Sequence, residues 1–104
     1  MKTKLYIAGK ITGDPDYKKK FAAAQECFKK KGYIVLSPAF MPGGMRPEDY
    51  MRICFAMIDT ADEVAFLPGY ELSPGAQLEL QYCLYTDKIT NMPEREGLEG
   101  GEPG

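Results

Sequence analysis

The residues best suited to chemistry lie in the segment 69–79, where serine, glycine and glutamate are separated by helical spacing. Ser73 and Pro74 are typical of a helix start, whose first N–H groups lack partners and attract anions. Glu79 follows Gly75 by four residues, so its carboxylate lies on the same helix face and extends past the small residue. Such a carboxylate can act as a nucleophile or base. The alternative is that Ser73 only caps the helix and that Glu79 is an exposed helix residue.

A glycine-containing loop near the N-terminus, residues 9–13, is a second candidate. It matches neither the G-x-G-x-x-G fingerprint nor a P-loop, but its glycines allow a sugar or phosphate to lie against the backbone. Tyr6 precedes the loop, and its hydroxyl either reaches a carboxylate at the ligand or belongs to a core aromatic. The candidate substrate-binding residues are Gly9, Lys10, Ile11, Gly13, Ser73 and Gly75.

Four short apolar segments alternate with three amphipathic ones, which predicts the element order β-α-β-α-β-α-β. This order is typical of a small three-layer α/β/α sandwich with a four-stranded parallel sheet, as in Rossmann and flavodoxin-like folds. Ligands bind such sheets beyond the C-terminal ends of the strands. The loops expected at that edge are 9–16, 37–46 and 68–75. The predicted strands are 5–8, 33–36, 64–67 and 88–90, and the predicted helices are 16–31, 47–61 and 73–86.

Length and composition predict one domain, residues 1–93, followed by an acidic tail, residues 94–104, that we expect to be disordered. The chain has 104 residues and a net charge of −2, which does not suit a surface for polymeric nucleic acid. It has no histidine, which excludes Ser-His-Asp and Cys-His catalysis and histidine metal sites. Three widely spaced cysteines fit buried thiols better than disulfides or a zinc site.

Hydropathy predicts no membrane association, because no apolar run approaches the ~20 residues of a membrane span. The N-terminal apolar segment is too short for a signal peptide, so we expect a cytoplasmic protein. We expect neither a cofactor nor a bound metal.

Taken together, these segments resemble the nucleoside 2-deoxyribosyltransferase-like superfamily, and more closely its short branch from phages and prophages, a family of unknown function. The resemblance covers nearly all of residues 3–91, and its most specific part is the spacing from Ser73 to Glu79. The residues that carry it are the segments 6–13 (YIAGKITG), 47–54 (PEDYMRIC), 61–62 (AD) and 67–70 (LPGY), with Ser73, Gly75, Ala76 and Glu79.

The resemblance implies that Glu79 attacks C1′ of a deoxyribonucleoside or of its 5′-monophosphate. The resulting glycosyl-enzyme passes the sugar to another base or to water, which is the chemistry of a retaining glycosidase. The resemblance further implies that Tyr6 orients the glutamate and that Gly9 belongs to the loop that contacts the nucleoside. It also implies that Ser73 holds a 5′-phosphate, as the corresponding serine does in nucleotide hydrolases of the superfamily.

Three positions depart from the pattern of that superfamily. Cys54 stands where characterised enzymes have an aspartate near the sugar hydroxyls and the leaving base. A thiol is a poor acid at neutral pH, because its reference pKa is ~8.5. Thr12 replaces an arginine, and Leu72 replaces a common acidic residue. Glu71 is adjacent to that position and is therefore the candidate for the missing acid.

Two functions remain open from the sequence. The first is an enzyme that hydrolyses N-glycosidic bonds or transfers deoxyribose. The second is a nucleotide-binding sensor or modulator of the same fold without turnover, favoured by the loss of the aspartate at Cys54. A flavodoxin-like electron carrier is disfavoured because no aromatic-flanked flavin loop is evident. We also expect a homo-oligomer, most simply a dimer, that meets through residues 41–51 with Tyr50, since methionine and tyrosine suit interface cores.

Overall fold

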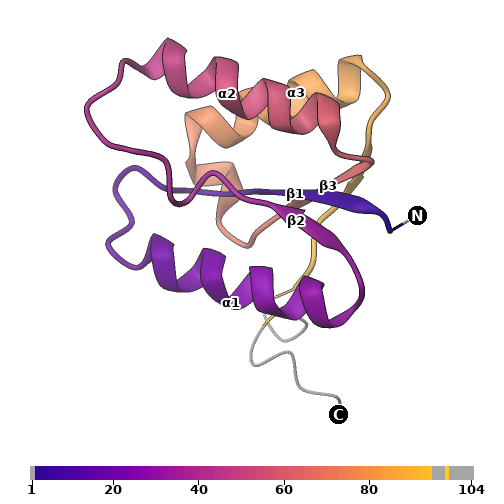
Figure 1. Cartoon of the computed structure of the whole chain (residues 1–104). Helices are drawn as coiled ribbons and strands as arrows, with labels where there is room; N and C mark the ends of the chain where they lie inside the picture. The colour runs from indigo at the N-terminus through magenta and orange to yellow at the C-terminus, as the bar shows by residue number, and fades with distance from the viewer. Residues whose placement is uncertain (1, 95–97, 99–104) are drawn as a thin grey trace.

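Four parallel strands form one sheet in the order β2-β1-β3-β4 in a computed structural model, which describes residues 2–94 and Leu98 (Figure 1). The strands are β1 (Lys4–Ala8), β2 (Ile34–Leu36), β3 (Glu63–Phe66) and β4 (Ile89–Asn91). The helices are α1 (Tyr17–Lys30), α2 (Pro47–Thr60) and α3 (Pro74–Tyr85), with a short 3-10 turn η1 (Tyr70–Leu72) before α3. The predicted α/β sandwich with a four-stranded parallel sheet is thus confirmed.

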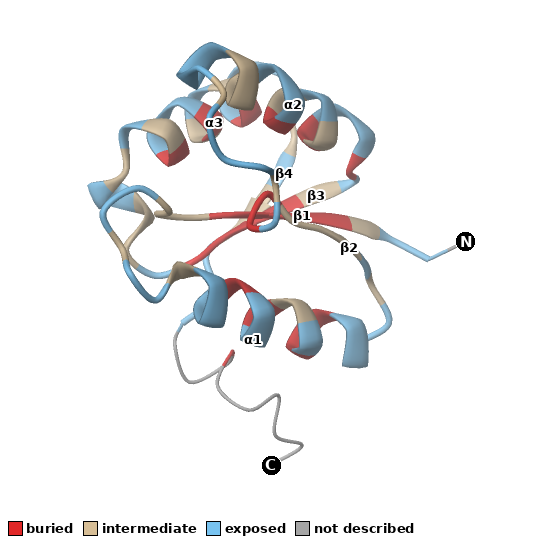
Figure 2. Cartoon of the chain, turned by 60° about the vertical axis from the view of Figure 1, so that its left-hand side comes forward, coloured by how far each residue is buried: buried red, intermediate tan, exposed pale blue. Residues whose placement is uncertain are grey.

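The two central strands are the most apolar, because each is covered on both faces. In β1 the residues from Leu5 to Ala8 are fully buried, and in β3 so are those from Val64 to Phe66. Buried residues gather on these strands and on the inward faces of the helices (Figure 2). The edge strands β2 and β4 have only three residues each, and their first residues are exposed.

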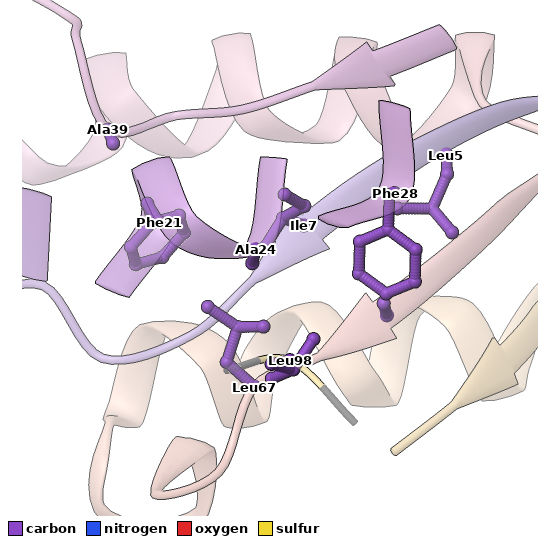
Figure 3. Packing of buried hydrophobic residues seen from close by; sticks show 9 residues of the cluster. Leu5, Ile7, Phe21, Ala24, Phe28, Ala39, Leu67 and Leu98 are labelled. Carbon is purple, nitrogen blue, oxygen red and sulfur yellow. The ribbon is translucent and has the colours of Figure 1, made fainter. Parts of the chain in front are cut away.

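Side chains of β1 alternate between two separate cores, as the period of a strand requires. Leu5 and Ile7 pack with Phe21, Ala24 and other residues of the α1 layer (Figure 3). Tyr6 and Ala8 point to the opposite layer, where α2 and α3 lie. This alternation directs the hydroxyl of Tyr6 towards the layer that contains α3.

Helix ends agree with the signals in the sequence. Ser73 caps α3, since its Oγ accepts the N–H of Ala76 at 3.1 Å, and Pro74 occupies the first helical position. Gly32 follows α1 with φ +97°, a left-handed conformation that favours glycine. Asp16 occupies the N-cap position of α1 but makes no side-chain cap hydrogen bond. Its own N–H instead donates to the carboxylate of Asp14 at 2.9 Å.

The strand order places a topological switch point between β1 and β3. From β1 the chain proceeds outward to β2, and from β3 it proceeds the other way to β4. The loops that leave β1 and β3 therefore diverge towards opposite helical layers, which opens a crevice at the C-terminal edge.

The domain boundary expected at residue 93 falls just after β4. Most of the acidic tail expected over residues 94–104 lies outside the described residues. Leu98 is described, and it packs into the α1-side core near Leu67 (Figure 3). Among the described residues, no helix combines the length and the apolar character needed to cross a bilayer.

Candidate functional site

A cleft of about 830 Å3 lies at the C-terminal edge of the sheet, beside the switch point. This volume falls in the range of small-molecule sites. All three loops expected at this edge contribute, through residues 9–12, the segment 38–45 and the start of α3. The cleft is therefore where the described part of the chain would accept a ligand.

Glu79 and Tyr6 form a hydrogen-bonded pair in the buried part of this cleft. The Tyr6 hydroxyl donates to Oε2 of Glu79 at 2.9 Å. Only 5% of Glu79 is exposed and none of Tyr6 is, although both line the cleft. Glu79 is thus not the exposed helix residue that the sequence also allowed. A carboxylate facing a cleft from so buried a position can serve as a nucleophile or base.

Burial sets the protonation of this carboxyl group. Desolvation raises the pKa of Glu79 from 4.5 to about 7, although hydrogen bonds from Tyr6 and Cys54 act in the opposite direction. Burial also raises the pKa of Tyr6 well above its usual value, and the negative charge of Glu79 adds to that effect. Tyr6 therefore remains a hydrogen-bond donor while Glu79 changes its charge near neutral pH.

Cys54 lines the same cleft from α2 and is buried beside Tyr6. Burial raises the pKa of its thiol to about 11, and the charge of Glu79 contributes. The group is thus a neutral thiol at physiological pH and a weak hydrogen-bond donor. Among the described residues, no three His, Cys, Asp or Glu side chains are grouped to hold a metal ion.

Ser73 and Gly75 both line the cleft at the start of α3. The Ser73 oxygen accepts the N–H of Ala76, which leaves its own O–H proton available to a ligand. A Cβ built on Gly75 would lie 3.5 Å from the terminal methyl group of Met51, an ordinary contact. Glycine at this position therefore keeps space open in the cleft, and the backbone fold does not demand it.

The loop after β1 contributes Gly9, Lys10 and Ile11 to the cleft, whereas Gly13 is not among the lining residues. A Cβ on Gly9 would approach Phe21 Cζ to 3.2 Å and Leu67 Cβ to 3.3 Å. Core packing therefore leaves little room for a side chain at position 9, a reason for glycine that adds to its place in the cleft lining. Gly13 has φ +85°, and the Lys10 side chain lies against it.

Glu71, the candidate for the missing acid, is exposed on η1 and does not line the cleft. Its backbone carbonyl accepts a hydrogen bond from the side-chain amide of Gln77. The neighbouring Leu72 does line the cleft. Glu79 is therefore the only carboxylate among the described residues that line it.

Loop 37–46 was expected at this edge, but the individual side chains of the cleft wall and one cation were not predicted as site residues. Lys18, in the first turn of α1, lines the cleft. Its position just after the β1 loop, at the same sheet edge, was the available signal. The walls include Tyr17, Tyr50 and three methionines from the Pro- and Met-rich segment and α2, namely Met41, Met45 and Met51. Adaptable thioethers and flat aromatic rings suit a planar, partly apolar ligand.

Tyr50 fastens the segment 38–45 beside the cleft. Its hydroxyl donates to the carbonyl of Pro42 at 2.7 Å and accepts the N–H of Met45 at 3.3 Å. The segment, rich in Pro and Gly, has no strand or helix of its own. One α2 side chain therefore connects this wall to the helix through two hydrogen bonds, one donated and one accepted.

Comparison with curated proteins gives no match for this chain. A family model described as a domain of unknown function, DUF4406, matches residues 3–90. That match extends from the residue before β1 into β4, so it includes every element that builds the cleft. The chain therefore belongs to the DUF4406 family.

Proposed function

We propose that this protein cleaves the N-glycosidic bond of a nucleoside or nucleoside 5′-monophosphate, by hydrolysis or by deoxyribosyl transfer, with Glu79 as the nucleophile. The observation that supports this most strongly is the buried Tyr6–Glu79 pair, 2.9 Å apart, facing a cleft of ligand size. The resemblance of residues 6–13, 47–54 and 67–79 to the nucleoside 2-deoxyribosyltransferase-like superfamily assigns the same role to the same glutamate.

In the proposed reaction, an ionised Oε of Glu79 attacks C1′ of the sugar while the bond from C1′ to the base nitrogen breaks. The electron pair of that bond leaves with the base, and a glycosyl ester of Glu79 remains. Water or a second base then attacks C1′ and releases the carboxylate. When water attacks, its proton is lost to solvent and the departed base takes up a proton.

Two further groups fit this role. Tyr6 fixes the orientation of the Glu79 carboxylate through its hydrogen bond and remains protonated. Ser73 and the amide of Gly75, at the N-terminus of α3, suit a 5′-phosphate because free N–H groups and the helix dipole favour an anion there. Glu79 lies on the same helix, with Gly75 and Ala76 one turn before it.

The test is incubation with a panel of deoxynucleoside 5′-monophosphates, followed by mass spectrometry of products and protein. We expect release of free base, and a deoxyribosyl adduct on the peptide that contains Glu79. The matched control Glu79→Gln keeps the side-chain shape and should show neither. Turnover that persists in Glu79→Gln would exclude this nucleophile.

A catalytically inactive nucleotide sensor or modulator is the second candidate. It is favoured by the chemistry around Glu79, because Cys54 is neutral and no second carboxylate from the described residues lines the cleft. Retaining glycosidases use two carboxyl groups. Protection of the protein from thermal unfolding by a nucleotide, without any product or adduct, would support the sensor.

A further inference from the structure

Two lysines in the cleft have no role in the function proposed so far. Lys10 and Lys18 both line it, one from the β1 loop and one from α1. The nearby carboxylate of Asp14 pairs with Lys20 at 2.8 Å. Neither Lys10 nor Lys18 has a carboxylate partner within 4.0 Å among residues 2–94 and Leu98. Lys10 interacts with the charge of Asp14 at longer range, but neither ammonium group is held in a close ion pair among those residues, so both can reach a ligand.

The position of Lys18 is unfavourable for the fold itself. The N-terminus of a helix carries partial positive charge and is stabilised by acidic residues. The first turn of α1 has no acidic residue and contains three consecutive lysines, Lys18, Lys19 and Lys20. Lys20 is balanced by its ion pair with Asp14, whereas Lys18 has no such partner among the described residues and faces the cleft, where it could meet an anionic or electron-rich group.

These lysines lie on the opposite side of the cleft from the phosphate-binding candidates. Ser73 and Gly75 begin α3 in one helical layer, whereas Lys18 belongs to α1 in the other (Figure 1). The Lys10 side chain lies beside Gly13, at the α1 end of the β1 loop, where a built Cβ would be 3.9 Å from Nζ. A nucleotide with its phosphate at Ser73 and its C1′ at Glu79 would extend its base towards Lys10 and Lys18.

We propose that Lys10 and Lys18 bind carbonyl oxygens of the base and stabilise the negative charge that the base acquires as it leaves, so that purines with a keto group at C6 and pyrimidines with a keto group at C4 are the preferred substrates. This inference rests on the proposed function. An ammonium group donates hydrogen bonds and accepts none, so it pairs with a carbonyl oxygen but not with an exocyclic amine.

The electron balance of the step explains why such cations are useful here. The electron pair of the C1′–N bond remains on the departing base, and its charge is delocalised onto the ring carbonyl oxygens. Enzymes that place a carboxylic acid near the base can protonate it. This cleft has only Cys54, a neutral thiol of high pKa, at the corresponding position. Hydrogen bonds from Lys10 and Lys18 would stabilise the anion without transferring a proton.

The first experiment measures binding alone, in the Glu79→Gln background, by calorimetry at fixed salt. The ligands are paired: deoxyinosine against deoxyadenosine 5′-monophosphate, and deoxyuridine against deoxycytidine 5′-monophosphate. Each pair exchanges the carbonyl group at C6 or C4 for an amine, with the matching change of the adjacent ring N–H to a bare nitrogen, and keeps the sugar phosphate and, in the pyrimidines, the C2 carbonyl. We expect the keto member to bind about 10- to 100-fold more tightly, the range of one or two charge-assisted hydrogen bonds.

The second experiment adds Lys10→Met and Lys18→Met to that background, with Lys19→Met as the matched control. Lys19 lies on the same turn of α1 but does not line the cleft. The two cleft variants should each lower the preference for the keto member, and the control should keep it. In otherwise unchanged protein, the same variants should reduce turnover of keto substrates more than of amino substrates.

The outcomes separate this inference from the function on which it rests. Tight nucleotide binding with no keto preference, or with a preference that survives both lysine substitutions, would overturn the inference alone. An equal loss with Lys19→Met would show that only overall charge matters and would also overturn it. If no nucleotide binds to any variant or to the unchanged protein, the proposed function fails as well.

Discussion

At the scale of single residues, Glu79 is held where its charged form is disfavoured, and stability should depend on pH accordingly. The pKa of Glu79 is about 7 in the folded protein in place of 4.5. The folded state therefore holds the proton more tightly than the unfolded state, and protonation of Glu79 stabilises the fold at low pH. That contribution is complete below pH ~4.5 and is lost as pH rises through ~7. The loss amounts to roughly 3 kcal/mol. Glu79→Gln should therefore be more stable than the unchanged protein at about pH 8, with the difference shrinking towards pH 5.

Urea unfolding at these two pH values measures the free energies directly. Glu71→Gln is the matched control, since Glu71 is exposed and outside the cleft. It should leave the free energy of unfolding unchanged at both pH values. A Glu79→Gln variant that is less stable than the unchanged protein at about pH 8 would show that the carboxylate is structural.

Tyr6→Phe removes the hydroxyl that donates to Glu79 and keeps the ring. Because this hydrogen bond opposes the effect of burial, its loss should raise the pKa of Glu79 above about 7. The midpoint of the pH-rate profile should then move to higher pH, with activity partly recovered in alkaline buffer. A profile that falls uniformly without moving would mean that the Tyr6 hydroxyl orients Glu79 without setting the pKa of its carboxyl group.

The role of a single residue was predictable where sequence neighbours determine it, and was not predictable where contacts with distant residues determine it. The Ser73 cap followed from local helix-start signals. Strand alternation left Tyr6 open between a core aromatic and a partner of a carboxylate, and it was the resemblance that indicated its pairing with Glu79. Gly9 was assigned to the cleft, which it lines, but Phe21 and Leu67 also leave little room for a side chain there. Those partners are distant in sequence, so no local pattern shows them. The exposure of Glu71 likewise depends on η1, a turn that the sequence analysis did not predict.

At the scale of elements, the strands and helices were predictable to within one or two residues, because each has clear stop signals. The walls of the cleft were not, since the segment 38–45 has no periodicity and depends on two hydrogen bonds from Tyr50. The sequence indicated the region 41–51, with Tyr50, as a contact surface between subunits. Met41, Met45, Tyr50 and Met51 of this region line the cleft, and its contact with a second subunit stays a prediction.

Two glycine substitutions should separate fold from site at this scale. Gly9→Ala forces its Cβ to within 3.2 Å of Phe21 and 3.3 Å of Leu67, so it should destabilise the protein by about 1–3 kcal/mol. Gly75→Ala meets Met51 at an ordinary 3.5 Å, so stability should change little. It narrows the cleft, however, and should weaken nucleotide binding. Thermal unfolding and calorimetric titration of both variants test this, and equal stability losses would contradict it.

At the scale of the whole molecule, we propose a dimer that forms over the mouth of the cleft. Phe40 and Leu72 are 62% and 68% exposed, and they flank and line this opening. A second copy placed there would cover apolar surface and restrict water access to Glu79. Light scattering at high micromolar concentration should give twice the chain mass, and Phe40→Ser should lower it. Tyr85→Ser, at the far end of α3, is the control, and a monomer mass for the unchanged protein would exclude the dimer.

The hydrogen bond between Tyr6 and Glu79 joins residues 73 positions apart. Contacts of such long range form late in folding, because the chain between them must lose conformational entropy first. Tyr6 leaves the ribosome early, whereas Glu79 arrives in the last helix of the sheet domain. A nascent or truncated chain without α3 contains neither the carboxylate nor the helix start beside it. Any reactivity of Glu79 is thereby coupled to completion of the fold.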